Sequence, residues 1–313
     1  MTVGEDIQLL LGASLAWFSV FLAASIAAAG LYRVFRMLAT LTPPAGRGGV
    51  LMLYGLQPFV VATLVVCMLN FAALYSWLLP EHCHNGLCAP HAPEFAAPAA
   101  QAALGGATAL LGLLALAWFA ATHIFKRLRQ SRVARHLAEP GRGYRLIDSN
   151  RPAAWCDGLC FPTVYVSRGL LETLNESELR IVLAHEHAHA RRRDNLSRLI
   201  LDWVTWFWPA AARRSLRADF RLAAEQACDA EAALLAGNEQ PVSELIARFE
   251  TTSNESAAPA PLMLGERISE LRISPAYSDG AALAPWAALL VLWLVSVFLF
   301  TLAAHPLLEW LSA

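Results

Sequence analysis

Residues 183–194 read LAHEHAHARRRD and place three histidines and a glutamate within five positions. His185 and His189 are four residues apart, so on a helix their imidazoles lie on one face, one turn apart. Together with Glu186 they form an H-E-x-x-H motif, in which two histidines bind zinc and the glutamate acts as general base toward water. His187 points elsewhere on the helix and receives no ligand role.

The helix that carries this motif has a clear beginning in the sequence. Asn175 is a good N-cap, and Glu178 three residues later completes a capping box. We therefore predict a helix over about 176–193. The alternative is that residues 185–193 are a solvated helix without a metal.

A later predicted helix offers the remaining side chains of a zinc site. It covers residues 219–237 and is ended by Gly237. Glu225 and Asp229 lie four apart on one of its faces, among alanines, where unpaired carboxylates would be costly. Catalytic zinc needs a third protein ligand, which we assign to Glu225, while Asp229 orients a ligating histidine through its other ring nitrogen. The alternative partner of Glu225 is Arg221.

The composition points to a membrane. Of the 313 residues, 57% are hydrophobic and only 16% are charged, which is too apolar for an ordinary soluble domain. Four apolar runs lack acidic and basic residues across their centres and are long enough to cross a bilayer. They cover about 9–31, 55–79, 102–125 and 281–304.

The flanking charges give the orientation. Arg33, Arg36 and Arg47 lie between the first two runs, and five basic residues follow the third within 126–135. The other flanks carry only acidic residues, so the positive-inside rule puts both termini outside and 126–280 in the cytoplasm. The net charge of −1 gives no indication of direct nucleic-acid binding.

The expected fold is an α-helical membrane protein with a mainly α, α+β zinc peptidase domain, which the family resemblance described next implies is gluzincin-like. Its predicted parts are a three-span region, the peptidase domain, a fourth span and a short external tail: 1–125, 126–280, 281–304 and 305–313. The same resemblance implies a bacterial inner membrane as the location.

Two segments carry a resemblance to a known family. ELRIVLAHEHAHARRRDNL (178–196) and FWPAAARRSLRADFRLAAEQACDAEAALL (207–235) resemble the peptidase domain of the BlaR/MecR family of bacterial membrane metallopeptidases. The matching features are H-E-x-x-H running into R-R-x-D, Phe-x-Pro before a basic helix, and E-x-A-C-D. The resemblance implies one catalytic Zn²⁺ on the two motif histidines and Glu225, with Glu186 as base and Asp229 as orienting residue.

In gluzincins of this kind, an edge strand holds the substrate backbone by strand addition. The segment CFPTVYVSRGLLETL (160–174) resembles the part that precedes the zinc helix. Its β-branched and aromatic residues predict a strand that serves as this edge: Thr163, Val164, Tyr165 and Val166. An ordinary core strand is the alternative.

The resemblance implies a signal-transducing protease that inactivates a DNA-binding repressor, a cytoplasmic protein substrate. The β-lactam sensors of that family carry a penicillin-binding domain after the fourth span, where this sequence has nine residues, so direct acylation is not expected. An HtpX-like quality-control protease is one alternative. Such chains place a hydrophobic hairpin between the two motifs, whereas residues 190–224 here hold one moderately apolar stretch, interrupted by Asp202 and Pro209. A non-enzymatic receptor with a structural zinc is the other alternative, although such a zinc usually has four protein ligands.

Two further segments leave alternatives open. The external loop holds either a soft-metal sensor or a disulfide with solvated histidines. Its residues are His82, Cys83, His84, Cys88 and His91. The tryptophan-rich stretch 199–214 is either a membrane-interface segment or a packing helix of the domain.

Overall fold

The structure is a computed structural model that describes residues 3–70, 83–84, 87–88, 99–253, 264–272 and 279–312. It is mostly helical, and four of its helices are long and apolar enough to cross a membrane. These helices are α1 (Val3–Ala39), α2 (Pro44–Asn70), α4 (Ala99–Leu137) and α11 (Asp279–Ser312). The four apolar runs of the sequence lie on these helices, except that residues 71–79 of the second run lie outside the described residues.

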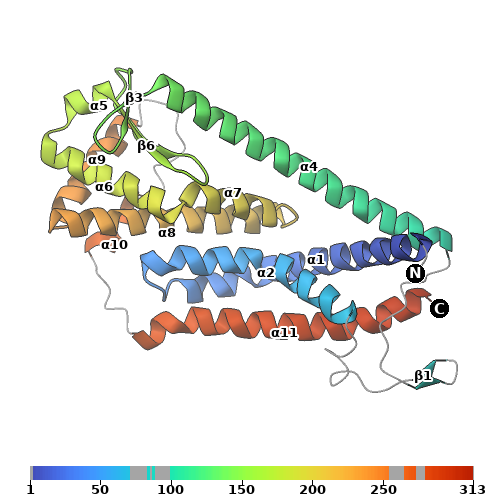
Figure 1. The fold of residues 1–313 in the computed structure, drawn as a ribbon. Coiled ribbons are helices and arrows are strands. Elements are labelled where there is room, and N and C mark those ends of the chain that lie inside the picture. Colours follow the sequence, from blue (N-terminus) through green and yellow to red (C-terminus); the bar gives the residue numbers. More distant parts are fainter. Residues whose placement is uncertain are drawn as a thin grey trace.

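Three of these helices lie side by side, while α4 diverges from them (Figure 1). The N-terminal end of α1 and the C-terminal end of α11 lie at the same end of this group, away from the segment predicted as the peptidase domain (Figure 1). Near that end, Gly106 of α4 meets α1, where an added Cβ would lie 2.6 Å from Cβ of Leu11. A small residue therefore permits this close crossing. From there α4 runs without a break into the segment after residue 125.

A four-stranded sheet follows α4, in the order β3-β4-β6-β5. Its strands are β3 (Glu139–Pro140), β4 (Arg145–Ile147), β5 (Ala154–Asp157) and β6 (Thr163–Ser167). The strand predicted as the edge, Thr163 to Val166, is β6 and lies between two neighbours. The expectation of an edge strand at this place is therefore wrong, because the preceding segment 154–157 folds back and pairs antiparallel along it.

The remaining helices form the body of the domain. They are α5 (Arg168–Thr173), α6 (Glu176–Arg192), α7 (Asp194–Val204), α8 (Ala210–Ala236), α9 (Gln240–Ser253) and α10 (Leu264–Arg272). The predicted capping box is confirmed, since Asn175 and Glu178 bond to each other's backbone amides at the start of α6. Gly237 ends α8 in the left-handed conformation, as expected, but α8 begins at Ala210, nine residues earlier than predicted.

The helical hairpin of α7 and α8 packs along the candidate spans. At its tip, Phe207 lies 5.6 Å and 5.7 Å, ring centre to ring centre, from Phe18 and Phe21 of α1. Further along, Asp219 accepts a hydrogen bond from Tyr32 and pairs with Arg36. Contacts from position 18 to 36 cover about 27 Å of α1 at 1.5 Å per residue, close to the thickness of a bilayer core. The hairpin therefore follows α1 for most of a span.

Two polar features of this hairpin are accommodated by the fold. Asp202 pairs with Arg217 over 2.8 Å, and Pro209 precedes the first residue of α8 instead of interrupting a helix. Trp208 is 3% exposed and packs on Tyr32 and Tyr54 of the spans. Asp202 and Pro209, which interrupt an apolar stretch of the sequence, therefore give no reason to prefer the regulatory over the HtpX-like alternative.

The predicted external loop falls largely outside the described residues. Short strands β1 (Cys83–His84) and β2 (Leu87–Cys88) pair so that Cys83 lies opposite Cys88. His82 and His91, and the side chains of the three other loop residues, lie outside the described part of the chain. The choice between sensor and disulfide stays a prediction.

Candidate active site

The two motif histidines and Glu225 meet where α6 crosses α8. The Nε2 atoms of His185 and His189 lie 3.2 Å apart, and the carboxylate of Glu225 lies 3.5 Å and 3.6 Å from them. One donor atom from each side chain falls within 4.8 Å of the others. Helical spacing explains the pairing within α6, while the crossing with α8 supplies the third group.

Each imidazole is held by a carboxylate on its other nitrogen. His185 Nδ1 lies 3.0 Å from Asp229, and His189 Nδ1 lies 2.7 Å from Asp194. Arg267 of α10 donates to both oxygens of Asp229 over 2.7 Å each. Such contacts fix the ring orientation and leave Nε2 of each histidine directed at the shared space.

The structure places the predicted site residues together and adds two that sequence reasoning missed. Asp229 lies where an orienting carboxylate was expected. Asp194 and Arg267 had no assigned role. The resemblance contained Asp194 as the last residue of R-R-x-D, which was its only signal in the sequence. Nothing in the sequence around Arg267 indicates a site.

The local electrostatics favour a positive charge between the imidazoles. Burial opposes a charged His185, but its hydrogen bonds with Asp229 and Glu225 prevail and raise its pKa to about 10. Burial also opposes a charged His189, and Asp194 prevails there, which raises the pKa to about 12. The pKa of Glu225 is held well below its usual range by the same histidines, despite its burial. Either protons on the imidazoles or a metal cation between them would supply this positive charge.

Zn²⁺ fits this donor set. Two imidazole nitrogens and a carboxylate oxygen are the ligands of a catalytic zinc of the His₂Glu type, and three protein donors leave a coordination position free. The carboxylates behind both histidines complete the usual surroundings of such ligands. His185, His189 and Glu225 would hold the ion, which would act as a Lewis acid on a carbonyl group.

Glu186 lies beside this cluster and faces the sheet. Burial raises its pKa above the ordinary range of a carboxyl group, more than the two imidazoles lower it. The backbone amide of Cys156 lies close enough to stabilise the carboxylate charge. Burial, followed by the charge of Glu186, raises the pKa of the Cys156 thiol to about 12, so this cysteine is a neutral thiol.

The open edge of the sheet is β5, and it borders the site. The Ser167 amide donates to the carbonyl of Ala153, one residue before β5, over 2.9 Å. Alternate residues from there on bond to β6, so Ala154 and Cys156 turn their N–H and C=O groups to the open edge. Asn195 of α7 donates to the Cys156 carbonyl over 2.9 Å, which fixes this end of the strand.

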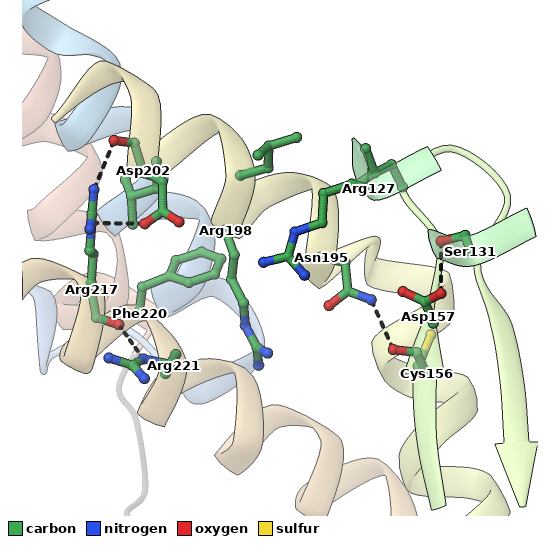
Figure 2. Close-up of a pocket in the computed structure, with 13 residues that line it drawn as sticks. Arg127, Ser131, Cys156, Asp157, Asn195, Arg198, Asp202, Arg217, Phe220 and Arg221 are labelled. Atoms are coloured by element: carbon green, nitrogen blue, oxygen red, sulfur yellow. Dashed lines mark hydrogen bonds and ion pairs between the residues drawn. The ribbon is translucent and has the colours of Figure 1, made fainter. Parts of the chain in front are cut away.

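Three hollows follow one another along this edge. The middle one, about 190 Å³, holds the metal cluster, Glu186 and Arg198. The second, about 350 Å³, begins at Pro152 and is lined mainly by apolar side chains of α6, α8 and α9. The third, about 540 Å³, begins at Cys156 and Asp157 and is lined by four arginines (Figure 2). A chain laid along β5 thus meets an apolar hollow at one end and a basic hollow at the other.

Comparison with known proteins supports a metallopeptidase domain. Residues 126–267 match the sequence profile described as Peptidase family M48, so this segment is similar to the metallopeptidase domains of that family. The match lies within the predicted domain of 126–280 and contains the whole metal cluster. It does not single out the BlaR/MecR type. No curated protein and no solved structure matches the chain.

Proposed function

We propose that this protein is an integral membrane zinc metalloendopeptidase that cuts a protein substrate with Glu186 as general base. The observation that carries the proposal is the cluster of His185, His189 and Glu225 beside Glu186 and an open strand edge. The M48 match and the four apolar helices support the same class of enzyme.

The side chains have distinct roles in this reaction. The substrate backbone pairs with the free N–H and C=O of Ala154 and is held as an added strand. Glu186 takes a proton from the attacking water and passes it to the leaving amine, a task that its raised pKa suits. Arg198 lines the same hollow, 3.4 Å from Glu225, and offers N–H donors for the negative charge that develops on the scissile carbonyl.

The domain acts on the cytoplasmic side in this account. Arg36 and Arg47, which the positive-inside rule assigns to the cytoplasm, contact Asp219 and Gln226 of the domain. We propose a regulatory role in a bacterial inner membrane, with a DNA-binding repressor as substrate, because of the resemblance carried by 178–196 and 207–235.

Membrane protein quality control is the second candidate. The course of the α7–α8 hairpin along α1 favours it, since Phe207 reaches Phe18 in the middle of the first apolar run. A peptidase with its site so close to the bilayer has access to membrane-bound chains.

A comparison of new protein N-termini tests both roles. Cells that express the wild type are compared with cells that express Glu186→Gln, which keeps the shape of the side chain but removes the base. Glu186-dependent cuts in one small DNA-binding protein support the regulatory role. Many scattered cuts in membrane proteins support quality control. The same N-termini in both cultures contradict the proposed activity.

A further inference from the structure

The basic hollow beside the metal cluster has an excess of positive charge. It lies between α4, α7, α8 and the end of β5 and has a volume of about 540 Å³. Its four arginines are Arg127, Arg198, Arg217 and Arg221, and its two acids are Asp157 and Asp202. The α7–α8 hairpin and α4, which lies far from it in the sequence, thus contribute arginines to one space (Figure 2).

Only part of this charge is neutralised within the fold. Arg217 pairs with Asp202 over 2.8 Å, and Arg198 contacts Glu225 over 3.4 Å. Among the described residues, Arg127 and Arg221 have no carboxylate partner within 4.0 Å. Asp157 accepts a hydrogen bond from Ser131 instead of an arginine. Two guanidinium groups without a carboxylate partner and one carboxylate therefore remain in the hollow, and their net positive charge would be neutralised by a bound anion.

The hollow is continuous with the site of hydrolysis. Cys156, Asn195 and Arg198 line both this hollow and the smaller one that holds Glu186. From Ala154 to Asp157 the strand advances about 10 Å at 3.3 Å per residue. A substrate strand on β5 would thus place a side chain in the basic hollow two to four residues from the scissile bond.

We propose that this hollow is a specificity subsite that binds an acidic side chain, Asp or Glu, of the peptide substrate. Arg127 and Arg221 are its specificity-determining residues, since a carboxylate in the hollow would give either guanidinium group the charge-assisted hydrogen bonds that no carboxylate of the described residues supplies. The opposite end of β5 meets an apolar hollow, so the acid lies on one side of the scissile bond only. The inference rests on the proposed peptidase function and defines its substrate class.

A peptide-library digest tests the subsite. The full-length protein, purified and loaded with zinc, digests proteome-derived peptides in nanodiscs, and residue frequencies are counted around each cut. The variants are Glu186→Gln, Arg127→Glu, Arg221→Glu and, as matched control, Arg132→Glu, an exposed arginine of α4 outside the hollow.

The wild type should favour Asp and Glu at one position, two to four residues to one side of Glu186-dependent cuts. In Arg127→Glu and Arg221→Glu, the ratio of kcat/KM for acidic over neutral peptides should fall roughly ten- to hundredfold. Arg132→Glu should keep the wild-type ratio. Because the ratio is taken within each variant, partial unfolding does not alter it.

Three results overturn the inference, and they differ from one another. Absence of an acidic preference in an active wild type, or its persistence in both variants, removes the subsite and leaves the peptidase function. The rate of hydrolysis is also compared in nanodiscs with and without phosphatidylglycerol. If this lipid stimulates the wild type but not the two variants, and the residue preference is unchanged, the hollow is a lipid-headgroup site. Absence of any Glu186-dependent cut overturns the peptidase function itself, and the subsite with it.

Discussion

His189 Nδ1 lies 2.7 Å from a carboxylate oxygen of Asp194, five residues further along the chain. On a continuous helix these two side chains would not meet, since neighbours on one face are three or four apart. Arg193 between them adopts a left-handed conformation with φ of 54°, which ends α6 and turns Asp194 back. Both histidines of the candidate site thus have a carboxylate of their own.

Substitution of Asp194 by asparagine should weaken zinc binding without loss of the three proposed ligands. The amide cannot stabilise the partial positive charge of a metal-bound imidazole, so we expect a roughly ten- to hundredfold lower zinc affinity. Competition with a chelating dye measures this. Asp202→Asn on the same helix is the control, because Asp202 pairs with Arg217 away from the metal cluster. Equal zinc affinities of the two variants would show that Asp194 does not support zinc binding.

Replacement of Arg267 by methionine should destabilise the domain. Its partner Asp229 is 1% exposed in its side chain, and a buried carboxylate left without its arginine costs about 3 kcal/mol or more. The control is Arg168→Met, whose pair with Asp148 is exposed and contributes less than about 1 kcal/mol. Thermal unfolding in detergent compares the two, and similar losses in both variants would contradict the expectation.

Trp208 should anchor the α7–α8 hairpin to the spans. Its truncation to alanine removes a buried side chain that packs on Tyr32 and Tyr54, a change that costs about 3 kcal/mol at buried positions. Trp206 lies two residues away and is 48% exposed, so Trp206→Ala should cost much less. Thermal unfolding in detergent is the measurement. A lower unfolding temperature of Trp208→Ala alone is expected, and equal losses in both variants would show that Trp208 does not anchor the hairpin to these helices.

Proline at position 154 should impair substrate binding at the open edge. The Ala154 amide faces away from β6, so its loss leaves the sheet ladder intact, and proline is tolerated at such edge positions. We expect KM for peptides to rise about tenfold, the effect of one lost backbone hydrogen bond, with kcat changed far less. Ala154→Gly keeps the amide and serves as control. A wild-type KM in the proline variant would exclude strand addition at this residue.

Local sequence patterns predicted the parts of the site that lie on single helices. The capping box at Asn175, the H-E-x-x-H face and the end of α8 at Gly237 all follow from helical spacing and caps. Glu225 and Asp229 were placed on one face for the same reason. The crossing that brings this face to the histidines does not follow from helical spacing; it was expected because catalytic zinc needs a third protein ligand, and the family resemblance implied the same set.

The features that sequence reasoning missed depend on contacts between distant segments. Strand character at Thr163 to Val166 was evident, but strand order depends on whether residues 154–157 pair beside it, which periodicity does not reveal. In the sequence, Asp202 and Pro209 interrupt an apolar stretch. In the structure, Asp202 pairs with Arg217 and Pro209 precedes the first residue of α8, so neither interrupts the hairpin. Arg267 acquires a role only where α10 docks on α8.

The central claim is that a zinc ion and Glu186 together make this protein a peptidase. Its most direct test measures zinc content and peptide hydrolysis of the purified full-length protein, before and after chelation, beside Glu186→Gln. We predict one zinc per chain in both proteins. The wild type should hydrolyse peptides in a reaction that chelation abolishes and zinc restores, and the variant should not hydrolyse them. Hydrolysis by Glu186→Gln at the wild-type rate, or a wild type that binds no zinc, would contradict it.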